Sequence, residues 1–270
     1  MPNMNIIQAL NSALDNMLER DDDVIVYGED VGYFGGVFRT TDGLQEKYGA
    51  HRVFDSPLSE GGIMATAFGM GINGLRPVVE IQFADYIFPG YDQIVNELAK
   101  IRHRSGGQYW APVTVRTPAG GGIRGGHHHS QSPESQFTHT PGLKVAYCST
   151  PFNAKGLLIS AIECNDPVIF FEPKRCYRGP FYGDPHNVLN WEGHPEAEVP
   201  QSHYTVPLGE ARLVMEGDDC TVISWGAMVH VSEQAIRDSG VSCDLVDLQT
   251  LLPWDRDAVV NSIKKTGRCV

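Results

Sequence analysis

The sequence predicts an α/β fold built on a parallel sheet with helices on both faces. Two observations carry this prediction: short, continuous apolar runs recur along the chain, and segments with helical spacing of apolar residues separate many of them. Strands that are apolar on both sides are typical of parallel sheets buried between helices. The expected strands are Val24–Tyr27, Val53–Phe54, Pro77–Ile81, Val113–Val115, Val145–Tyr147 and Val168–Phe171.

Helical patterns lie between these strands. The first, Ile6–Leu18, precedes the strand at Val24, and the second starts at Glu60. A third has apolar residues at positions 94, 95, 98 and 101, the spacing of one helix face. The fourth, Asn153–Glu163, separates the last two strands, so strands and helices keep alternating as a parallel sheet requires.

A change of composition divides the chain. Between Pro173 and Pro207, prolines mixed with glycine, asparagine and histidine interrupt the alternation for longer than an ordinary loop. We therefore predict a first α/β domain over residues 1–178, a connector over 179–207 and the start of a second α/β domain over 208–270.

The second domain repeats the alternation. Its expected strands are Thr221–Ser224 and Leu245–Leu248, and its expected helices are Val229–Asp238 and Arg256–Lys265. Cys269-Val270 then has the pattern of a further strand, which would leave the edge of a sheet unfinished. We therefore expect this domain to be truncated.

Composition excludes several functions. A formal net charge of −12 argues against binding to nucleic acid or to an anionic membrane, because both require a basic surface. No apolar run reaches the roughly 18 residues of a membrane helix, and the N-terminus does not resemble a signal peptide. We expect a cytoplasmic protein, or one of the mitochondrial matrix if the source is eukaryotic. The six irregularly spaced cysteines indicate reduced, structural thiols.

One carboxylate has unusual surroundings. Glu60 follows the strand at Phe54 and starts a helix of small and apolar residues. A carboxylate buried there costs free energy unless it is paired, coordinated or used. It could instead simply cap the helix N-terminus, where negative charge is favoured. The segment alone leaves both readings open.

Other polar residues follow different strands. Gln82 and Tyr86 come after the strand that ends at Ile81, and His129 ends a run of three histidines on a later loop. In parallel sheets, ligands bind at the carboxyl ends of strands, so we expect Glu60, Gln82, Tyr86 and His129 to lie around one crevice. Three adjacent histidines cannot all bind one metal ion, so we expect one of them to face the site as a proton donor.

Two glycine patterns are misleading. The G-x-G-x-x-G matches at 69–74 and 120–125 lack the arrangement of a strand before and a helix after that dinucleotide binding needs. A nicotinamide-binding fold is therefore disfavoured.

Several segments together resemble the beta subunit of thiamine-diphosphate-dependent 2-oxoacid dehydrogenases. The resemblance runs from near Met4 to Val270, and the blocks at 82–87 and 94–97 resemble the branched-chain (2-oxoisovalerate) subtype more than the pyruvate subtype. The segments that carry it are Ser56–Glu60, Val79–Tyr86, Asp92–Glu97, His129–Glu134 and Phe170–Lys174.

The resemblance implies a pyrimidine-binding α/β domain followed by a transketolase C-terminal-type domain. It implies that Glu60 hydrogen-bonds the pyrimidine ring of thiamine diphosphate, with a pKa raised by apolar surroundings. Gln82 and Tyr86 would contact the same ring. His129 matches the proton donor in acyl transfer to a lipoyl group.

The resemblance also implies metal sites and partners. Family members bind K⁺ mostly through backbone carbonyls, which correspond here to Ala111, Val113, Thr114, Ala161, Cys164 and Asp166. The chain lacks the Gly-Asp-Gly segment and Asn ligands that hold Mg²⁺ and diphosphate in thiamine enzymes. An alpha subunit is therefore expected to supply them, in an alpha2beta2 heterotetramer that docks on a lipoyl acyltransferase core.

Three alternatives remain open at this point. The chain could be a pyruvate-specific beta subunit, or a non-catalytic scaffold for the alpha chain. It could also be a solitary transketolase-like enzyme that binds thiamine diphosphate and Mg²⁺ alone.

Overall fold

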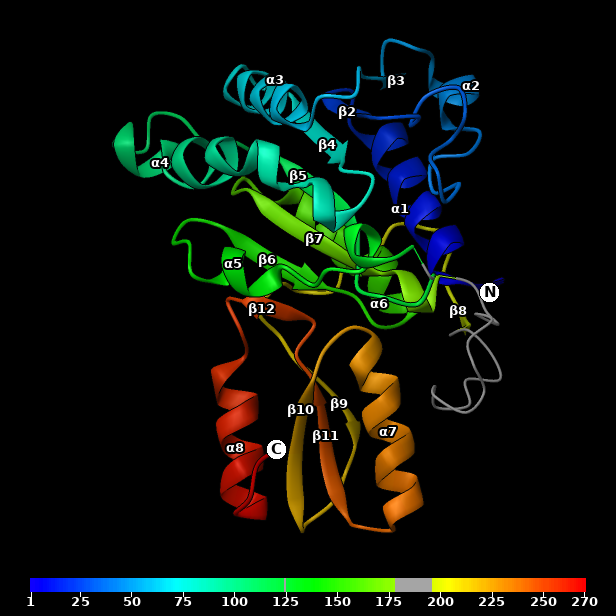
Figure 1. The fold of residues 1–270 in the computed structure, drawn as a ribbon, viewed down its shortest axis with the longest axis vertical. Helices are drawn as coiled ribbons and strands as arrows, with labels where there is room; N and C mark the ends of the chain where they lie inside the picture. The colour runs from blue at the N-terminus through cyan, green and yellow to red at the C-terminus, as the bar shows by residue number, and fades with distance from the viewer. Residues whose placement is uncertain (124, 178–195) are drawn as a thin grey trace.

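The computed structural model describes residues 1–123, 125–177 and 196–270 and confirms the α/β fold with a mainly parallel sheet (Figure 1). Seven strands lie in the order β12-β6-β7-β5-β4-β2-β3, and every neighbouring pair is parallel except β12 with β6. These strands are β2 (Val24–Gly28), β3 (Val53–Asp55), β4 (Arg76–Glu80), β5 (Thr114–Ala119), β6 (Lys144–Tyr147), β7 (Val168–Pro173) and β12 (Thr250–Leu252).

Helices and single turns connect the strands. The α-helices are α1 (Ile6–Arg20), α2 (Leu44–Tyr48), α3 (Glu60–Ile72), α4 (Ile101–Arg104), α5 (Glu134–Thr138), α6 (Pro151–Glu163), α7 (Ala227–Ser239) and α8 (Arg256–Thr266). The shorter turns are η1 (Ala84–Tyr86), η2 (Phe88–Gly90), η4 (His127–His129) and η5 (Lys174–Cys176), with a π-helix, η3, at Gln93–Leu98. Within the described ranges, none of these helices has the length and apolar character that a membrane span needs.

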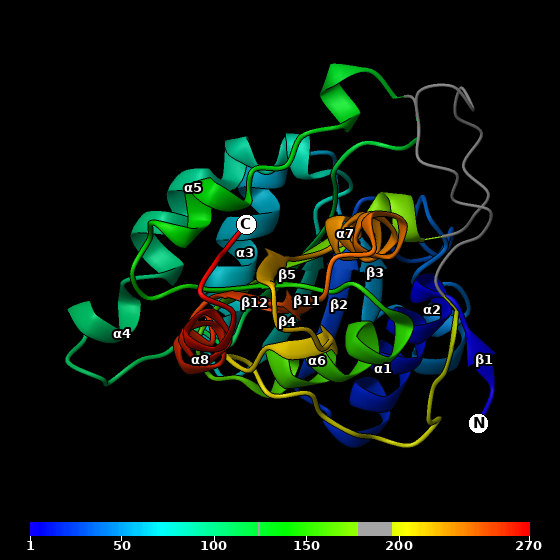
Figure 2. The same cartoon turned by 90° about the horizontal axis from the view of Figure 1, so that it is seen from below.

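The strands are apolar on both sides because each side faces a separate core. In β2, Val24 and Val26 pack with α1 and α6, whereas Ile25 and Tyr27 pack with α3 and η3. Figure 2 shows α1 and α6 on one side of the sheet and α3 on the other. The continuous apolar runs of the sequence are therefore buried strands, as predicted.

The helices begin where local chemistry favours them. Asn5 accepts a hydrogen bond from the N–H of Gln8 and donates its own N–H to the Gln8 side chain, which forms a capping box at the start of α1. Thr150 caps α6, and Pro151 occupies its first position, where a missing N–H costs nothing.

One predicted helix differs from expectation. The segment with apolar residues at 94, 95, 98 and 101 forms the π-helix η3 and then the short helix α4. The Ala99 N–H donates to Ile94 O, five residues back. Gly142 packs against the Ala99 carbonyl so closely that a Cβ would overlap it. Contact with this distant loop therefore accompanies the altered helical path.

The C-terminal part forms a smaller sheet with the order β10-β11-β9, between α7 and α8 (Figure 1). Its strands are β9 (Arg212–Met215), β10 (Cys220–Ser224) and β11 (Cys243–Asp247). Val270 exchanges backbone hydrogen bonds of 2.9 Å with Thr221 and Ile223 of β10, so the strand pattern at Cys269-Val270 is confirmed. The pairing of β12 with β6 of the larger sheet was not predicted from the sequence.

The expected connector lies partly outside the described residues, since positions 178–195 are not described. The remainder follows the first domain closely. The buried Lys155 of α6 donates to Ser12 Oγ and to the carbonyls of Pro200 and Gln201, at 2.7–2.9 Å. A short strand β8 (Ala197–Glu198) also pairs with β1 (Asn3–Met4).

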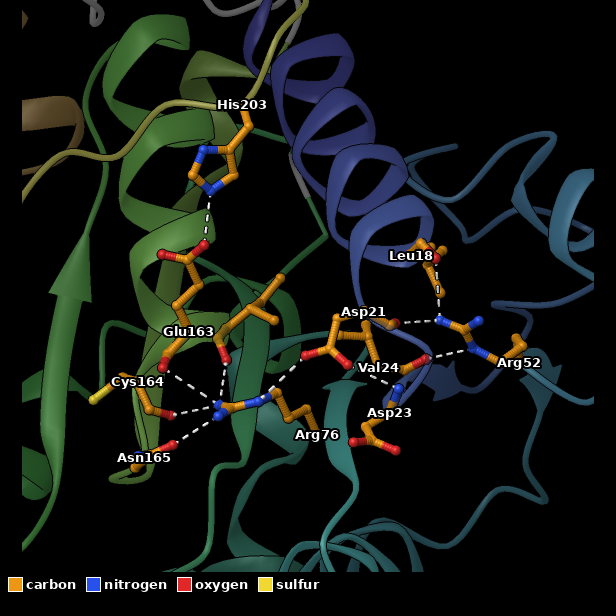
Figure 3. Close-up of polar contacts among 11 residues, drawn as sticks. Leu18, Asp21, Asp23, Val24, Arg52, Arg76, Glu163, Cys164, Asn165 and His203 are labelled. Carbon is orange, nitrogen blue, oxygen red and sulfur yellow. Dashed lines mark hydrogen bonds and ion pairs between the residues drawn. The ribbon is translucent and has the colours of Figure 1, made fainter.

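Arg76 joins three elements at the amino ends of the strands (Figure 3). It starts β4, and its guanidinium donates to the carbonyl oxygens of Ile162 (3.1 Å), Glu163 (3.3 Å) and Cys164 (3.5 Å) at the end of α6. Its Nε lies 3.4 Å from Asp21 Oδ2, just after α1. A cation here satisfies carbonyls that have no partner within the helix and complements the helix dipole.

Replacing Arg76 tests how much these contacts contribute to stability. We expect Arg76→Met to lower the free energy of unfolding by about 1.5–3 kcal/mol, because charge-assisted hydrogen bonds to a helix end are lost. Urea denaturation measures the change. The matched control is Arg237→Met, whose pair with Glu233 is a half-exposed contact on one helix and should cost about 0.5 kcal/mol or less. Equal losses in the two variants would contradict the interpretation.

Candidate active site

Polar residues gather where the central strands end. Glu29 and Asp30 directly follow β2. Gln82 follows β4, the strand that pairs with β2. Gln82 Nε2 donates to Asp30 Oδ2 at 3.1 Å. Asp30 adopts a left-handed backbone conformation (φ 58°), which an Asp tolerates better than most residues. This end of the sheet is where a parallel α/β fold binds its ligands.

Glu60 lies at the first turn of α3, against η2. A Cβ at Gly90 would lie 3.2 Å from Glu60 O and 2.5 Å from Met64 Cγ, so a glycine allows η2 to approach α3 this closely. Glu60 is half-buried in the chain alone, because β3, which leads to α3, is the last strand of the sheet. Its role at a cofactor stays a prediction.

A second carboxylate lies beside Glu60. Glu29 is only 5% exposed, and its Oε1 has no hydrogen-bond partner within the described residues. Burial, then the nearby charges of Glu60 and Asp30, raise the pKa of Glu29. An unsatisfied buried acid beside an accessible one suits a ligand that offers N–H groups and a basic ring nitrogen, as the pyrimidine ring of thiamine diphosphate does.

His129 is fixed by both of its ring nitrogens. Its Nδ1 lies 2.9 Å from Gly125 O, and its Nε2 lies 3.0 Å from Tyr86 Oη. A carbonyl can only accept, so the neutral ring carries its proton on Nδ1 and accepts the Tyr86 hydroxyl proton at Nε2. His127 and His128 are exposed, whereas His129 is half-buried. That His129 faces a ligand stays a prediction.

Phe83 and Asp85 support this histidine. The Phe83 ring lies 4.5 Å from the His129 ring in an edge-on arrangement. Asp85 Oδ1 accepts the backbone N–H groups of Ser130 (3.1 Å) and Gln131 (3.2 Å), immediately after His129. Neither role was predicted from the sequence. Their position after β4, beside Gln82 and Tyr86, is the only signal that the sequence offers.

A buried ionic group joins three central strands of the sheet. Arg116 of β5 places Nη1 2.9 Å from Glu80 Oε2 of β4 and Nε 2.7 Å from Glu172 Oε1 of β7. The Tyr177 hydroxyl donates to Glu172. All three charged side chains are at most 4% exposed. Burial raises the pKa of Glu80, and the guanidinium of Arg116 opposes that shift.

The residues expected to bind K⁺ lie at the opposite end of the sheet. Ala111, Val113, Thr114 and Ala161 are buried there. The Asp166 carboxylate is paired with Lys144 at 2.7 Å and with Arg102, so its side chain already has two cations. No group of three or more His, Cys, Asp or Glu side chains in the described ranges could hold a metal ion. A carbonyl site that includes Cys164 stays a prediction.

Two family models cover most of the chain. Residues 2–180 match the transketolase pyrimidine binding domain, and residues 209–270 match the transketolase C-terminal domain. The 2-oxoisovalerate dehydrogenase subunit beta of Pseudomonas aeruginosa is 56% identical over 99% of this chain and 77% of that protein. The chain belongs to the 2-oxoacid dehydrogenase beta-subunit family.

Other family members and one solved structure extend the comparison. The mitochondrial 2-oxoisovalerate dehydrogenase subunit beta of Dictyostelium discoideum is 53% identical over 99% of this chain and 69% of its own length. The pyruvate dehydrogenase E1 subunit beta of Acholeplasma laidlawii is 46% identical over 97% and 77%. A split gene transketolase in an inactive beta4 tetramer has a TM-score of 0.73 at 19% identity over 98% of this chain and 78% of that chain, and shares the fold.

Arg116→Met tests the buried ionic group. It leaves Glu80 and Glu172 without their cation, so we expect a loss of about 3–5 kcal/mol in the free energy of unfolding at neutral pH. Uncompensated burial raises carboxyl pKa values in the folded state above the unfolded values. The folded variant then binds more protons, and its stability should rise as pH falls from 8 to 5.

Urea denaturation at both pH values measures this effect. Arg102→Met is the matched control, because its pair with Asp166 is partly exposed and should contribute about 0–1 kcal/mol. If the free energy of unfolding of Arg116→Met did not change with pH, or equalled that of Arg102→Met, the two buried carboxylates would not depend on Arg116 for their stability.

Proposed function

We propose that the chain is the beta subunit of a 2-oxoisovalerate (branched-chain 2-oxoacid) dehydrogenase. Such an enzyme decarboxylates a branched-chain 2-oxoacid oxidatively and passes the acyl group to a lipoyl group of an acyltransferase. The observation that carries the proposal is the greater identity to relatives named for 2-oxoisovalerate, 56% and 53%, than to those named for pyruvate, 46% and 45%. The crevice geometry is consistent with it.

Thiamine diphosphate supplies the carbanion chemistry of decarboxylation when bound. Glu60 would hold a proton at the pyrimidine ring nitrogen, and Gln82 and Tyr86 would contact the same ring. Glu29 lies close enough for its charge to interact with Glu60. One carboxyl of such a neighbouring pair holds a proton more readily than an isolated one, which favours proton exchange with a ring nitrogen.

His129 would serve acyl transfer. With Nδ1–H directed at Gly125 O, a second proton adds at Nε2, beside Tyr86 Oη. The imidazolium can then donate that proton to a thiolate that forms as a lipoyl disulfide opens. Tyr86 and Gly125 keep the ring in one orientation for this step.

A second chain would complete the site. Leu58, two residues before Glu60, is 82% accessible, and Tyr33, in the loop after β2, is 91% accessible. A partner chain over this end of the sheet would bury both. We propose an alpha subunit there that holds diphosphate and Mg²⁺, in an alpha2beta2 heterotetramer docked on a lipoyl acyltransferase core. Structural K⁺ binding by backbone carbonyls belongs to the same proposal.

The names of two relatives support a proposal on cellular location. Those from Dictyostelium discoideum and Arabidopsis thaliana are named mitochondrial. We propose the mitochondrial matrix for a eukaryotic source of this chain and the cytoplasm for a bacterial one.

Glu60→Gln tests the catalytic assignment against a non-catalytic scaffold. Reconstituted with its alpha partner, the variant should lose at least about 100-fold in decarboxylation, because proton transfer at the ring nitrogen is lost. Assembly, followed by sedimentation velocity, should not change. Asp92→Asn on a neighbouring turn is the control and should retain activity. Near-normal turnover by Glu60→Gln would favour the scaffold.

Substrate comparison tests the acyl preference. The reconstituted pair should turn over 2-oxoisovalerate with a higher kcat/KM than pyruvate, and a reversed order would identify a pyruvate-specific subunit. Calorimetry on the isolated chain tests whether it can bind thiamine diphosphate and Mg²⁺ as a solitary enzyme. Binding of thiamine diphosphate and Mg²⁺ without a partner would contradict the need for an alpha subunit.

A further inference from the structure

Two buried groups of opposite charge lie behind His129 without hydrogen-bond partners. Lys174 is fully buried, and its Nζ has no partner within the described residues. Asp85 is 8% exposed, and its Oδ2, the oxygen that does not bind the loop, also has no partner there. A lone buried charge is strongly unfavourable, so two opposite ones in the same region balance each other.

Both groups come from strand ends that flank the crevice. Lys174 begins η5 after β7, and Asp85 lies in η1 after β4. The Lys174 ammonium lies 5.2 Å above the centre of the Phe83 ring, the same ring that packs 4.5 Å from His129. The Asp85 carboxylate reaches His129 through the loop backbone that it binds at Ser130 and Gln131. Each charge is therefore one contact away from the imidazole.

We propose that Lys174 and Asp85 are a pair of positioning residues for His129. Asp85 fixes the loop that carries the imidazole, and Lys174 balances the charge of Asp85, so the pair together sets how readily His129 takes a proton. This inference rests on the proposed role of His129 in acyl transfer. The effect on the imidazole is nevertheless measurable whether or not that role is correct.

The electrostatic argument has a definite sign. Asp85 stabilises an imidazolium at His129, whereas the Lys174 ammonium destabilises it. Burial lowers the pKa of Lys174 to about 8, and the nearby carboxylate of Asp85 acts in the opposite direction. Lys174 is therefore cationic over the range in which a histidine titrates. Tyr86 is the titratable group in contact with the His129 ring, at 3.0 Å. Asp85 on η1 and Lys174 on η5 each lie one contact away, and His127 and His128 precede His129 on its own turn.

Opposite shifts in two variants are the diagnostic result. We expect Lys174→Met to raise the pKa of His129 by about half a unit to one unit and Asp85→Asn to lower it by a similar amount. The double variant should return close to the wild type, and Lys174→Arg should restore the wild-type value. Hydrogen–deuterium exchange at the His129 imidazole carbon, followed by mass spectrometry on the full chain in the assembly it forms, measures each pKa.

The outcomes separate the proposals. Lys264→Met, which removes an exposed charge on α8, is the control and should leave the pKa of His129 unchanged. No shift in either variant, or shifts in the same direction, would show that Lys174 and Asp85 have a structural role only. If Asp85→Asn does not fold, the contrast between Lys174→Met and Lys174→Arg decides the question alone.

Acyl transfer provides a second, independent readout. The pH profile of lipoyl acylation by the reconstituted enzyme should move with the pKa of His129 in each variant, while decarboxylation with an artificial electron acceptor keeps its profile. If the pKa moves and the acylation profile does not, the positioning pair stands and the proposed role of His129 is wrong.

Discussion

The interaction on which the crevice depends is the buried contact of Arg116 with two carboxylates. Glu80, Arg116 and Glu172 belong to β4, β5 and β7, three adjacent strands at the centre of the sheet. None of these charges could remain in a dry interior without the others, because desolvation of an unpaired ion exceeds any packing gain. The group therefore fixes the ends of three strands relative to one another, and the loops that carry Gln82, Tyr86 and His129 start from those fixed ends.

The side chains at this end of the sheet form two chemically distinct halves. One half is acidic and contains Glu29, Asp30 and Glu60, whereas the other is aromatic and contains Tyr86 and His129 around Phe83. Gln82 and Phe83 are adjacent in sequence and contact opposite halves. In the function proposed above, proton exchange with a ring nitrogen would involve the acidic half, and proton delivery to a leaving thiolate would involve the aromatic half.

The sequence predicted the strands of the sheet, because they are continuous apolar runs. It also predicted which residues lie at the strand ends, because those residues directly follow the runs. Glu29 obeys the same strand-end rule and could have been found with it. Burial of Lys174 and Asp85 depends on how loops after two separated strands pack around Phe83, which no local pattern encodes. The openness around Glu60 likewise follows from β3 being an edge strand, a property of the strand order rather than of the helix itself.

The π-helix and β12 were missed because their causes are distant in sequence. A contact between Gly142 and Ala99 accompanies the first, and the pairing of Thr250–Leu252 with β6 creates the second. The pairing of β12 with β6 also affects how the two α/β units can move. A motion that separated the two α/β units would have to break the pairing of β12 with β6, so the C-terminal unit is attached to the edge of the larger sheet. Only β6 separates β12 from β7, the strand that carries Glu172.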